Sequence, residues 1–315
     1  MSRGYITIAV GNEYYYYLAK NLALSYAYNR DDEDYFPLGV ITDEAGSRYL
    51  SDYYDDMIIA GSDLSAKDKQ KGFNLMLRIY DHTPYDETIF IDSDSLIFKN
   101  PDFLFDWFEL NNSEVSVIGR RIPASSEYSR RTCFFSEQAI KDYKLLEYPS
   151  FNGGVYYFKK SDRAKECLDF AKEIMEHHYD ECGMIRFNGK KGDEPAYALA
   201  MAVYEMRPVV DKDGAAMKFN NRNVTYRDIS ILSHKCSIVQ SGESFDPAIF
   251  HISTINTYRS YYRNAVLELE AYFDDKKPDP LKKLAVTLGE PARMFGPVSK
   301  FLIARTRAKL KNGGR

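Results

Sequence analysis

The first part of the chain alternates between strand-like and helix-like segments, and this alternation constrains the fold more than any other feature. Short segments of apolar, β-branched and aromatic residues are separated by longer ones whose apolar residues follow a helical spacing. Such alternation predicts βαβ units, and therefore an α/β fold with a mostly parallel sheet and helices on both faces. The expected strands are 5–10, 37–42, 56–60 and 87–91, and the expected helices are 14–28 and 74–82.

The rest of the chain continues less regularly. The polar segment 120–150 shows little periodicity, whereas 161–179 follows helical spacing closely. Further strands are expected at 114–119, 153–158, 236–240 and 248–252, and a further helix at 194–206. The run 274–280, DDKKPDP, has the composition of a linker. We therefore expect a single domain over residues 1–273 and a basic C-terminal extension, with a helical tail, over 274–315.

The composition is that of a globular protein without a membrane-spanning segment. Hydrophobic residues make up 44% and charged residues 28% of the chain, and no apolar run reaches the length that a spanning helix needs. The N-terminal residues lack a signal-peptide pattern. The four cysteines show no C-x-x-C spacing, which argues against a disulfide framework or a zinc knuckle. These features predict a cytoplasmic protein.

The charge of the chain is unevenly distributed. Residues 281–315 contain nine basic residues and a single acid, Glu290, so they carry +8 against −12 for the remainder, which gives −4 in all. A tail that mixes cations with Leu, Phe and Ile can lie on an anionic membrane as a peripheral contact. It can equally be a solvated tail or an oligomer contact. Since the predicted domain is acidic, we expect no nucleic-acid partner.

The expected strand 87–91 runs directly into two aspartates, Asp92 and Asp94. Ligands of open parallel sheets bind beyond the carboxyl ends of the strands, and clustered carboxylates repel each other unless a cation neutralises them. Mg²⁺ and Mn²⁺ bind through one or two carboxylates and complete their shell with water and substrate phosphates. The pair therefore predicts a metal site that faces a phosphorylated ligand.

Two other interpretations of this D-x-D pair remain open. Aspartates can simply cap the next turn. Phosphatases of the haloacid-dehalogenase type also end a strand with D-x-D and use the first aspartate as nucleophile. Their motif closes the first strand of the domain, whereas three expected strands precede Asp92.

Five segments, in order along the chain, resemble GT-A glycosyltransferases, especially glycosyltransferase family 8, which includes glycogenin and bacterial galactosyltransferases. The segments are YITIAVGNEYYYYLAKNLALSY, TPYDETIFIDSDSLIFKNPDFLF, SFNGGVYYFKK, GDEPAYALAM and IFHISTINTYR. The resemblance covers roughly residues 5–262. It implies a Rossmann-like GT-A fold and transfer of a sugar from a nucleotide-diphospho-sugar.

The resemblance also implies the metal ligands. Asp92 and Asp94 would bind the ion, with Asp92 also near the ribose of the donor, and His251 would be the third protein ligand. Two carboxylates, an imidazole and diphosphate oxygens suit an octahedral Mn²⁺ or Mg²⁺ site, and the nitrogen ligand favours Mn²⁺.

The same resemblance implies the donor contacts. Tyr14 would stack on the uracil of a UDP-sugar, although the pattern alone fits the start of an amphipathic helix equally well. The remaining implied contacts are Val10, Gly11 and Asn12 for the edge of the base, and Asn152, Gly153 and Gly154 for the sugar.

Glu194 lies where many members of the family carry glutamine, near the reacting carbon, and Asp193 is the neighbouring candidate. A carboxylate there can act as a nucleophile or stabilise an oxocarbenium-like transition state, or it can serve as the base of an inverting attack. Both acids would also favourably charge the first turn of the following helix.

The cations of the chain depart from the family pattern. About sixteen residues before the motif, where the family usually has Lys or Arg, this chain has Met76, and Lys71 or Arg78 would have to replace that contact. Beyond His251 the family often has a glycine and then a lysine near the diphosphate. Here Arg259 is the nearby cation and is assigned to the donor.

Together these features predict a metal-dependent glycosyltransferase of the hexosyltransferase type that uses a UDP-sugar and retains the anomeric configuration. Its acceptor would be a hydroxyl group of a glycan, a lipid-linked molecule or a protein. The alternative from another class is a non-catalytic module that keeps the fold and binds a sugar nucleotide or a glycan.

Overall fold

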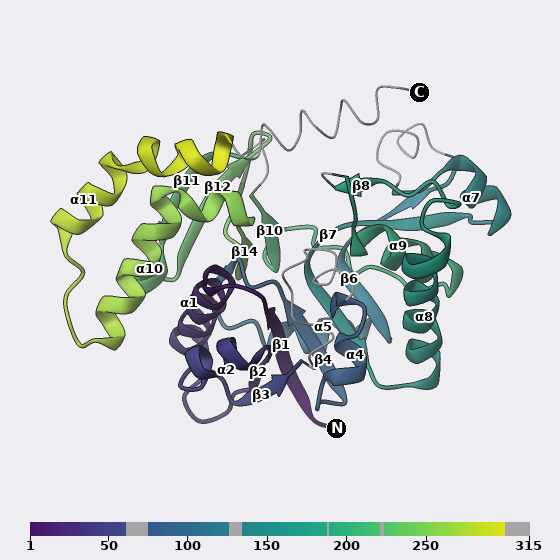
Figure 1. Cartoon of the computed structure of the whole chain (residues 1–315), viewed down its shortest axis with the longest axis horizontal. Helices are drawn as coiled ribbons and strands as arrows, with labels where there is room; N and C mark the ends of the chain where they lie inside the picture. The colour runs from purple at the N-terminus through teal and green to yellow at the C-terminus, as the bar shows by residue number, and fades with distance from the viewer. Residues whose placement is uncertain (61–74, 126–133, 188, 221–223, 300–315) are drawn as a thin grey trace. The chain divides into compact units, whose positions relative to one another are not determined.

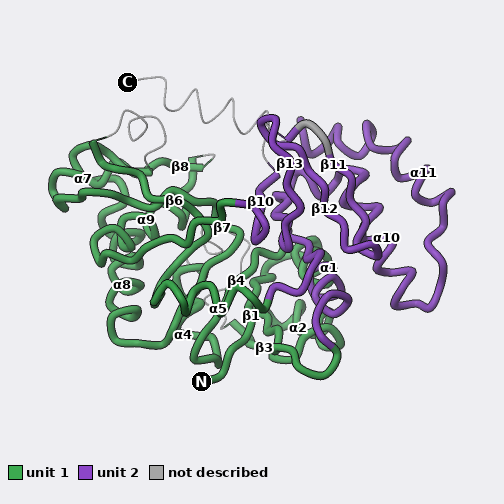
Figure 2. The backbone as a smooth tube through the Cα atoms, turned by 180° about the vertical axis from the view of Figure 1, so that it is seen from behind, with its two compact units in different colours: residues 1–20, 32–93, 102–212 green, residues 21–31, 94–101, 213–315 purple. Residues whose placement is uncertain are grey.

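The computed structural model describes five stretches of the chain, namely residues 1–60, 75–125, 134–187, 189–220 and 224–299. They form two compact units, each assembled from separate chain segments (Figure 2). Unit 1 is formed by residues 1–20, 32–93 and 102–212, and unit 2 by residues 21–31, 94–101 and those from 213 onward. The chain passes from one unit to the other between Ser93 and Asp94. The expected division of the chain after residue 273 stays a prediction.

A six-stranded sheet forms the centre of unit 1 (Figure 1). Its strands are β1 (Arg3–Ala9), β2 (Leu38–Thr42), β3 (Asp56–Ile59), β4 (Glu87–Ile91), β6 (Val115–Pro123) and β7 (Glu147–Lys159). In the order β3–β2–β1–β4–β7–β6, the first four strands are parallel, and β7 is antiparallel to both of its neighbours. Strands β2 and β4 are buried along their whole length, which explains why apolar and β-branched residues predominate in them.

Helices flank this sheet (Figure 1). They are α1 (Glu13–Asn29), α2 (Glu44–Leu50), α4 (Ile79–His82), α5 (Phe103–Leu110), α7 (Glu137–Asp142), α8 (Asp162–Glu173) and α9 (Asp193–Val203). Helix α8 continues as a turn of π-helix, Ile174–His178, and the hairpin of β8 (Arg186–Phe187) and β9 (Lys190–Lys191) leads into α9.

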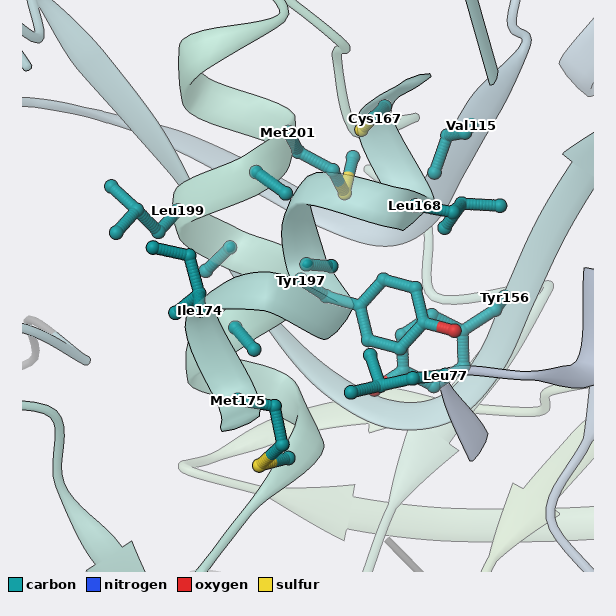
Figure 3. Close-up of a cluster of buried hydrophobic side chains, with 14 of the residues drawn as sticks. Leu77, Val115, Tyr156, Cys167, Leu168, Ile174, Met175, Tyr197, Leu199 and Met201 are labelled. Carbon is teal, nitrogen blue, oxygen red and sulfur yellow. The ribbon is translucent and has the colours of Figure 1, made fainter. Parts of the chain in front are cut away.

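Buried aromatic side chains pack between β7 and α9 (Figure 3). Tyr156 of β7 and Tyr197 of α9 are almost fully buried, and their ring centroids lie 4.6 Å apart. The hydroxyl of Tyr197 donates to the carbonyl of Met76, and that of Tyr156 donates to Asp193. Burial of each ring contributes roughly 1.5–3 kcal/mol, so the first turn of α9 is held firmly against the sheet.

Unit 2 contains two small sheets and the C-terminal helices. One sheet has the order β10 (Met217–Phe219), β14 (Ile249–His251), β5 (Ser95–Ile97), and the other is a meander of β11 (Val224–Ser230), β12 (Lys235–Gln240) and β13 (Glu243–Phe245). The 3₁₀ helices are Ile231–Ser233 and Thr254–Tyr258, and the α-helices are α10 (Ser260–Phe273) and α11 (Pro280–Leu288). Buried Glu268 of α10 accepts from the amide of Ile231 and pairs with Lys283, which ties α11 to α10.

The structure confirms the predicted α/β class and the mostly parallel, helix-flanked sheet. The expected helix at 74–82 is interrupted, because a turn over 77–78 precedes α4. The irregular segment 120–150 contains the ends of β6 and β7 and, between them, α7. None of the helices in the described stretches combines the length and the hydrophobicity that a membrane crossing requires.

Candidate functional site

Asp92 follows β4 directly, at the edge of the sheet where the parallel strands of unit 1 end. Its amide donates to the carbonyl of Gly154, 3.0 Å away, because Ile91 pairs with Val155 across the antiparallel β4–β7 ladder. The side chain of Asp92 is half-buried. The ladder therefore brings the first aspartate of the D-x-D motif beside the predicted sugar-binding glycines.

Asp94 and His251 meet within unit 2 because β5 pairs with β14. Ser95 lies opposite His251 in that antiparallel register, and both Asp94 and His251 are only 6% exposed. Nε2 of His251 lies 2.9 Å from Oδ1 of Asp94, while Oδ2 of Asp94 accepts a hydrogen bond of 3.0 Å from the hydroxyl of Thr254. The pairing of two strands far apart in sequence thus creates this contact.

The three predicted metal ligands fit a divalent cation. Asp92, Asp94 and His251 each offer one ligand atom, and these atoms lie within 4.8 Å of one another. Oδ1 of Asp94 is buried, yet it accepts no hydrogen bond from the described residues, because its approach to His251 lacks hydrogen-bond geometry. A buried carboxylate oxygen without a donor is costly unless a cation neutralises it. The oxygen and nitrogen donors suit Mn²⁺ or Mg²⁺.

Glu194 and Asp193 lie in the first turn of α9, where the helix dipole favours negative charge. Oε1 of Glu194 accepts from the amide of Gly153 at 2.6 Å, and Oδ2 of Asp193 accepts from the hydroxyl of Tyr156 at 2.8 Å. Burial raises the pKa of Asp193 to about 6, and the charge of Asp92 adds to this, although the Tyr156 hydroxyl and local amides act in the opposite direction. The two acids therefore point to different partners.

The predicted sugar-binding stretch lies in the middle of β7, against these acids. Asn152 Nδ2 lies 3.5 Å from Oε1 of Glu194. A Cβ atom on Gly153 would come within 2.8 Å of the Tyr156 hydroxyl and 3.1 Å of Oε1 of Glu194. Only glycine leaves space for the carboxylate at this position, so Gly153 and Glu194 form one unit of structure.

The predicted nucleotide-binding turn, Val10 to Asn12, is held by a residue that the sequence did not single out. Gly11 has φ of +93° and donates its amide to Oδ2 of Asp43 at 2.7 Å. The hydroxyl of Tyr16 donates to Oδ1 of the same carboxylate at 2.6 Å. Asn12 caps α1 through Tyr14, whose amide donates to its side chain. Asp43 thus fixes the turn after β1.

The ionisation of Asp43 and Tyr16 reflects this contact. Burial opposes the charge of Asp43, but hydrogen bonds from Tyr16 and from the amides of Gly46 and Gly11 lower the pKa of the carboxyl group. Burial, together with the neighbouring carboxylate, raises the pKa of Tyr16 to about 12.

The predicted base-stacking residue, Tyr14, lies partly exposed, and its ring stacks on that of Tyr17 with centroids 6.1 Å apart.

The predicted cations lie in surface ion pairs. Arg259 is exposed and pairs with Glu290 at 2.9 Å, and Arg78 approaches Glu176 at 3.7 Å. Met76 is partly buried against the unit 1 core. Lys71 lies outside the described residues. The diphosphate role of Arg259 stays a prediction.

The sequence reasoning missed two residues of this region, Asp43 and Thr254. Each holds a predicted site residue by a contact with a partner far along the chain: 32 positions for Gly11 and 160 for Asp94. The Asp-x-x-Gly spacing from Asp43 to Gly46 does indicate a helix cap, which the structure contains. No local pattern indicates the second contact that Asp43 makes.

Neither a family model nor a curated protein matches the sequence at a significant level. Solved structures do match, among them the bifunctional glycosyltransferase WbbM, with 13% identity over 91% of this chain and a TM-score of 0.57. The chain spans about half of that protein, 52%. Mouse xyloside xylosyltransferase 1 matches with 14% identity, over 81% of this chain and 99% of its own length, and a TM-score of 0.51.

The galactosyltransferase LgtC, solved in complex with donor and acceptor sugar analogs, has 11% identity and a TM-score of 0.53, over 90% of this chain and 99% of its own. An LgtC active-site mutant in which glutamate replaces glutamine matches with a TM-score of 0.52 and 11% identity. At such identities the agreement concerns architecture. The chain has the fold of the GT-A glycosyltransferases.

Proposed function

We propose that the protein is a metal-dependent glycosyltransferase, which moves a sugar from a UDP-sugar to a hydroxyl acceptor with retention of configuration. One observation carries the proposal: on a GT-A fold, Asp92, Asp94 and His251 offer ligand atoms within 4.8 Å of one another, and the buried Oδ1 of Asp94 has no hydrogen-bond donor among the described residues. A bound Mn²⁺ or Mg²⁺ would neutralise the diphosphate and stabilise the leaving group.

The residues of the chain divide the remaining work. Asp94 and His251 would each provide one ligand atom, and Asp92 would provide a third at the end of β4. The turn at Gly11, fixed by Asp43, offers the backbone that a uracil edge requires, and Tyr14 at the start of α1 offers a ring for stacking. Gly153 and Gly154 allow a sugar to approach the backbone of β7.

Glu194 is the carboxylate that we propose to act next to the anomeric carbon of the donor sugar. The amide of Gly153 donates to Oε1 of Glu194 at 2.6 Å and so holds this carboxylate beside the predicted sugar-binding stretch. A carboxylate so placed can stabilise positive charge on the anomeric carbon or act as a nucleophile. The LgtC mutant shows that an active-site glutamine can be exchanged for glutamate within this fold. Asp193, bonded to Tyr156, is the positioning partner in the same turn.

We also propose that the enzyme works in the cytoplasm and contacts an anionic membrane through its C-terminal region, where a lipid-linked acceptor would be found. On α11, Leu281, Leu284 and Leu288 recur at helical spacing and are 76%, 54% and 73% exposed. Lys282 and Lys283 lie beside them. An exposed apolar stripe with adjacent cations is typical of helices that lie on membranes.

A vesicle assay tests the membrane contact. The protein is expected to sediment with vesicles that contain phosphatidylserine, and to remain in solution with neutral phosphatidylcholine vesicles. Replacing Leu281, Leu284 and Leu288 by serine should abolish sedimentation. Equal binding of this triple variant would contradict the contact.

Calorimetry tests the main proposal. UDP, GDP, ADP and CDP are titrated into the protein with and without Mn²⁺, beside Asp94→Ala and the matched control Asp213→Ala, an exposed aspartate of unit 2. We expect UDP alone to bind tightly, only with Mn²⁺, in the wild type and the control but not in Asp94→Ala. UDP-sugars are then screened for transfer and for the anomeric configuration of the product.

Other outcomes point to the alternatives. UDP binding without any transfer to a broad acceptor panel would favour the non-catalytic module. Absence of nucleotide binding, together with phosphate release from phosphomonoesters that Asp92→Asn abolishes, would favour the phosphatase.

A further inference from the structure

Thr254 is hydrogen-bonded to Asp94, one of the candidate metal ligands. It lies in a part of the chain where the sequence departs from the family that it resembles. Its hydroxyl donates to Oδ2 of Asp94 at 3.0 Å, just after β14 ends at His251. The other oxygen of Asp94, Oδ1, faces Nε2 of His251 at 2.9 Å without forming a hydrogen bond. The two oxygens of one carboxylate therefore have different surroundings.

The loop that carries Thr254 is held in an uncommon conformation. Ser253 has φ of +61° and ψ of 140°, a combination that is strained for a residue other than glycine. Asn256 stabilises this bend, since its side chain donates to Oγ of Ser253 at 3.0 Å and its amide donates to the Ser253 carbonyl at 2.8 Å. Strain of this kind persists only where surrounding contacts enforce it, and here it brings the next residue, Thr254, against Asp94.

We propose that Thr254 restricts Asp94 to a single metal-binding oxygen, and thereby makes the site select Mn²⁺ or Mg²⁺ over Ca²⁺. The proposal rests on the metal site of the proposed function and assigns a further residue to it. The hydroxyl occupies one lone-pair site of Oδ2 and holds the carboxylate in place, so Oδ1, which accepts no hydrogen bond from the described residues, is the oxygen that an ion would favour. Thr254 is a positioning residue, because it acts on the ion through Asp94.

The preference follows from the coordination chemistry of the ions. Mg²⁺ requires near-ideal octahedral geometry at short range, which single-oxygen carboxylate ligands satisfy. Ca²⁺ takes six to eight oxygens and often binds both oxygens of one carboxylate. The nitrogen of His251 adds a preference for Mn²⁺ over the hard Ca²⁺ ion. Removing the Thr254 hydroxyl would release Oδ2 of Asp94, and so allow the two-oxygen mode that Ca²⁺ favours.

The test compares Mn²⁺ and Ca²⁺ affinity in Thr254→Val, Thr254→Ser and the control Thr287→Val. Thr287 is exposed on α11 and donates its hydroxyl to the carbonyl of Lys283. Free Mn²⁺ is measured by electron paramagnetic resonance, with and without UDP, and Ca²⁺ by competition. Loss of a group that orients a metal ligand typically weakens metal binding about 10- to 100-fold.

We expect Thr254→Val to lose Mn²⁺ affinity about 10- to 100-fold while its Ca²⁺ affinity is unchanged or higher. Thr254→Ser and Thr287→Val should both match the wild type. Ser253→Val, which disfavours the positive φ, should shift the same ratio although the hydroxyl is retained. Ser241→Val is its control, since Ser241 has φ of +54° in the β12–β13 turn.

An unchanged ratio of Mn²⁺ to Ca²⁺ affinity in Thr254→Val would overturn the inference while leaving the metal site intact. Parallel loss of both ions would also overturn it, because that result describes general damage to the site. A wild-type protein that binds no Mn²⁺, even with UDP, would instead reject the proposed function and this inference together. Unfolding midpoints for each variant identify any that fail to fold, and Thr254→Ala then replaces Thr254→Val.

Discussion

The buried acidic side chains of the two units differ in the hydrogen-bond donors that surround them. In unit 1, Glu194 and Asp193 each accept a hydrogen bond from a protein donor, the Gly153 amide and the Tyr156 hydroxyl. In unit 2, buried Asp94 also accepts one, from the Thr254 hydroxyl to Oδ2, but its Oδ1 is buried without a donor among the described residues. A protein donor at a carboxylate fixes its direction, whereas a missing donor creates a demand for a cation. We therefore expect substitutions at Asp94 to act through the proposed ion, and substitutions at Glu194 to leave nucleotide binding unchanged.

The largest effect on activity is expected from replacing the carboxylate of Asp94 by an amide. Asp94→Asn replaces one carboxylate oxygen by an NH2 group and removes the negative charge. A divalent ion would therefore lose an anionic ligand. Since metal and oxyanion stabilisation of a transition state is often worth a factor of 10² to 10³ for a single group, we expect transfer to fall about 1000-fold. Steady-state rates with the UDP-sugar found in the screen measure this, and Asp213→Asn should be unchanged.

A smaller effect is expected at Glu194. Glu194→Gln keeps an oxygen for the Gly153 amide, so the fold should be preserved, but it removes the charge that we propose to lie near the anomeric carbon. We expect kcat to fall on the order of 100-fold, with UDP affinity measured by calorimetry unchanged. A normal kcat would show that this carboxylate only braces β7, and Asp193 would then be the better catalytic candidate.

Gly153→Ala sharpens the same point without changing any charge. Its Cβ would come within 3.1 Å of Glu194 Oε1 and 2.8 Å of the Tyr156 hydroxyl. Overpacking of this kind typically costs about 1–3 kcal/mol, so unfolding should occur at lower denaturant concentration, and kcat should fall about tenfold because Glu194 is displaced. Gly296→Ala, where a Cβ meets nothing within 4 Å, is the matched control.

The smallest effect concerns stability, and it depends on pH. Burial raises the pKa of Asp193 from its ordinary value of 3.8 to about 6 in the folded protein, so the folded state binds the proton more tightly than the unfolded state does. Its contribution to stability is therefore lost as pH rises from about 4 to 6. Asp193→Asn should raise the free energy of unfolding by roughly 1–3 kcal/mol at pH 7.5, and by almost nothing at pH 4.

Chemical unfolding of the metal-free protein in EDTA, at both pH values, measures this gain. An equal gain at pH 4 and pH 7.5 would mean that packing, and not ionisation, limits stability at this position.

The parallel half of the fold could be predicted from the sequence, because β1, β2 and β4 are mostly buried and are therefore rich in apolar and β-branched residues. The D-x-D pair was visible for the same reason, since acids after such a strand are conspicuous. The antiparallel strand β7 was predicted only in part, because half of its 13 residues are polar or small. Its length depends on pairing with β6, which no local pattern encodes.

The contacts that orient the site were out of reach for a related reason. Asp43 and Thr254 are ordinary turn residues by sequence, and their partners are determined only when strands pair. Local propensity could place Asp43 at the start of α2, but it could not reveal that the same carboxylate holds Gly11. His251 was assigned through the resemblance alone, and the β5–β14 register brings it to Asp94.

Asp43 couples the turn at Gly11 to helix α2 within unit 1. Its carboxylate accepts at once from Gly11, after β1, and from Gly46, in the first turn of α2. A ligand that rigidifies the turn at Gly11 would therefore slow the local opening of α2, although no ligand atom touches that helix. The hydrogen-exchange rate of the Gly46 amide should therefore fall when a ligand binds at the turn.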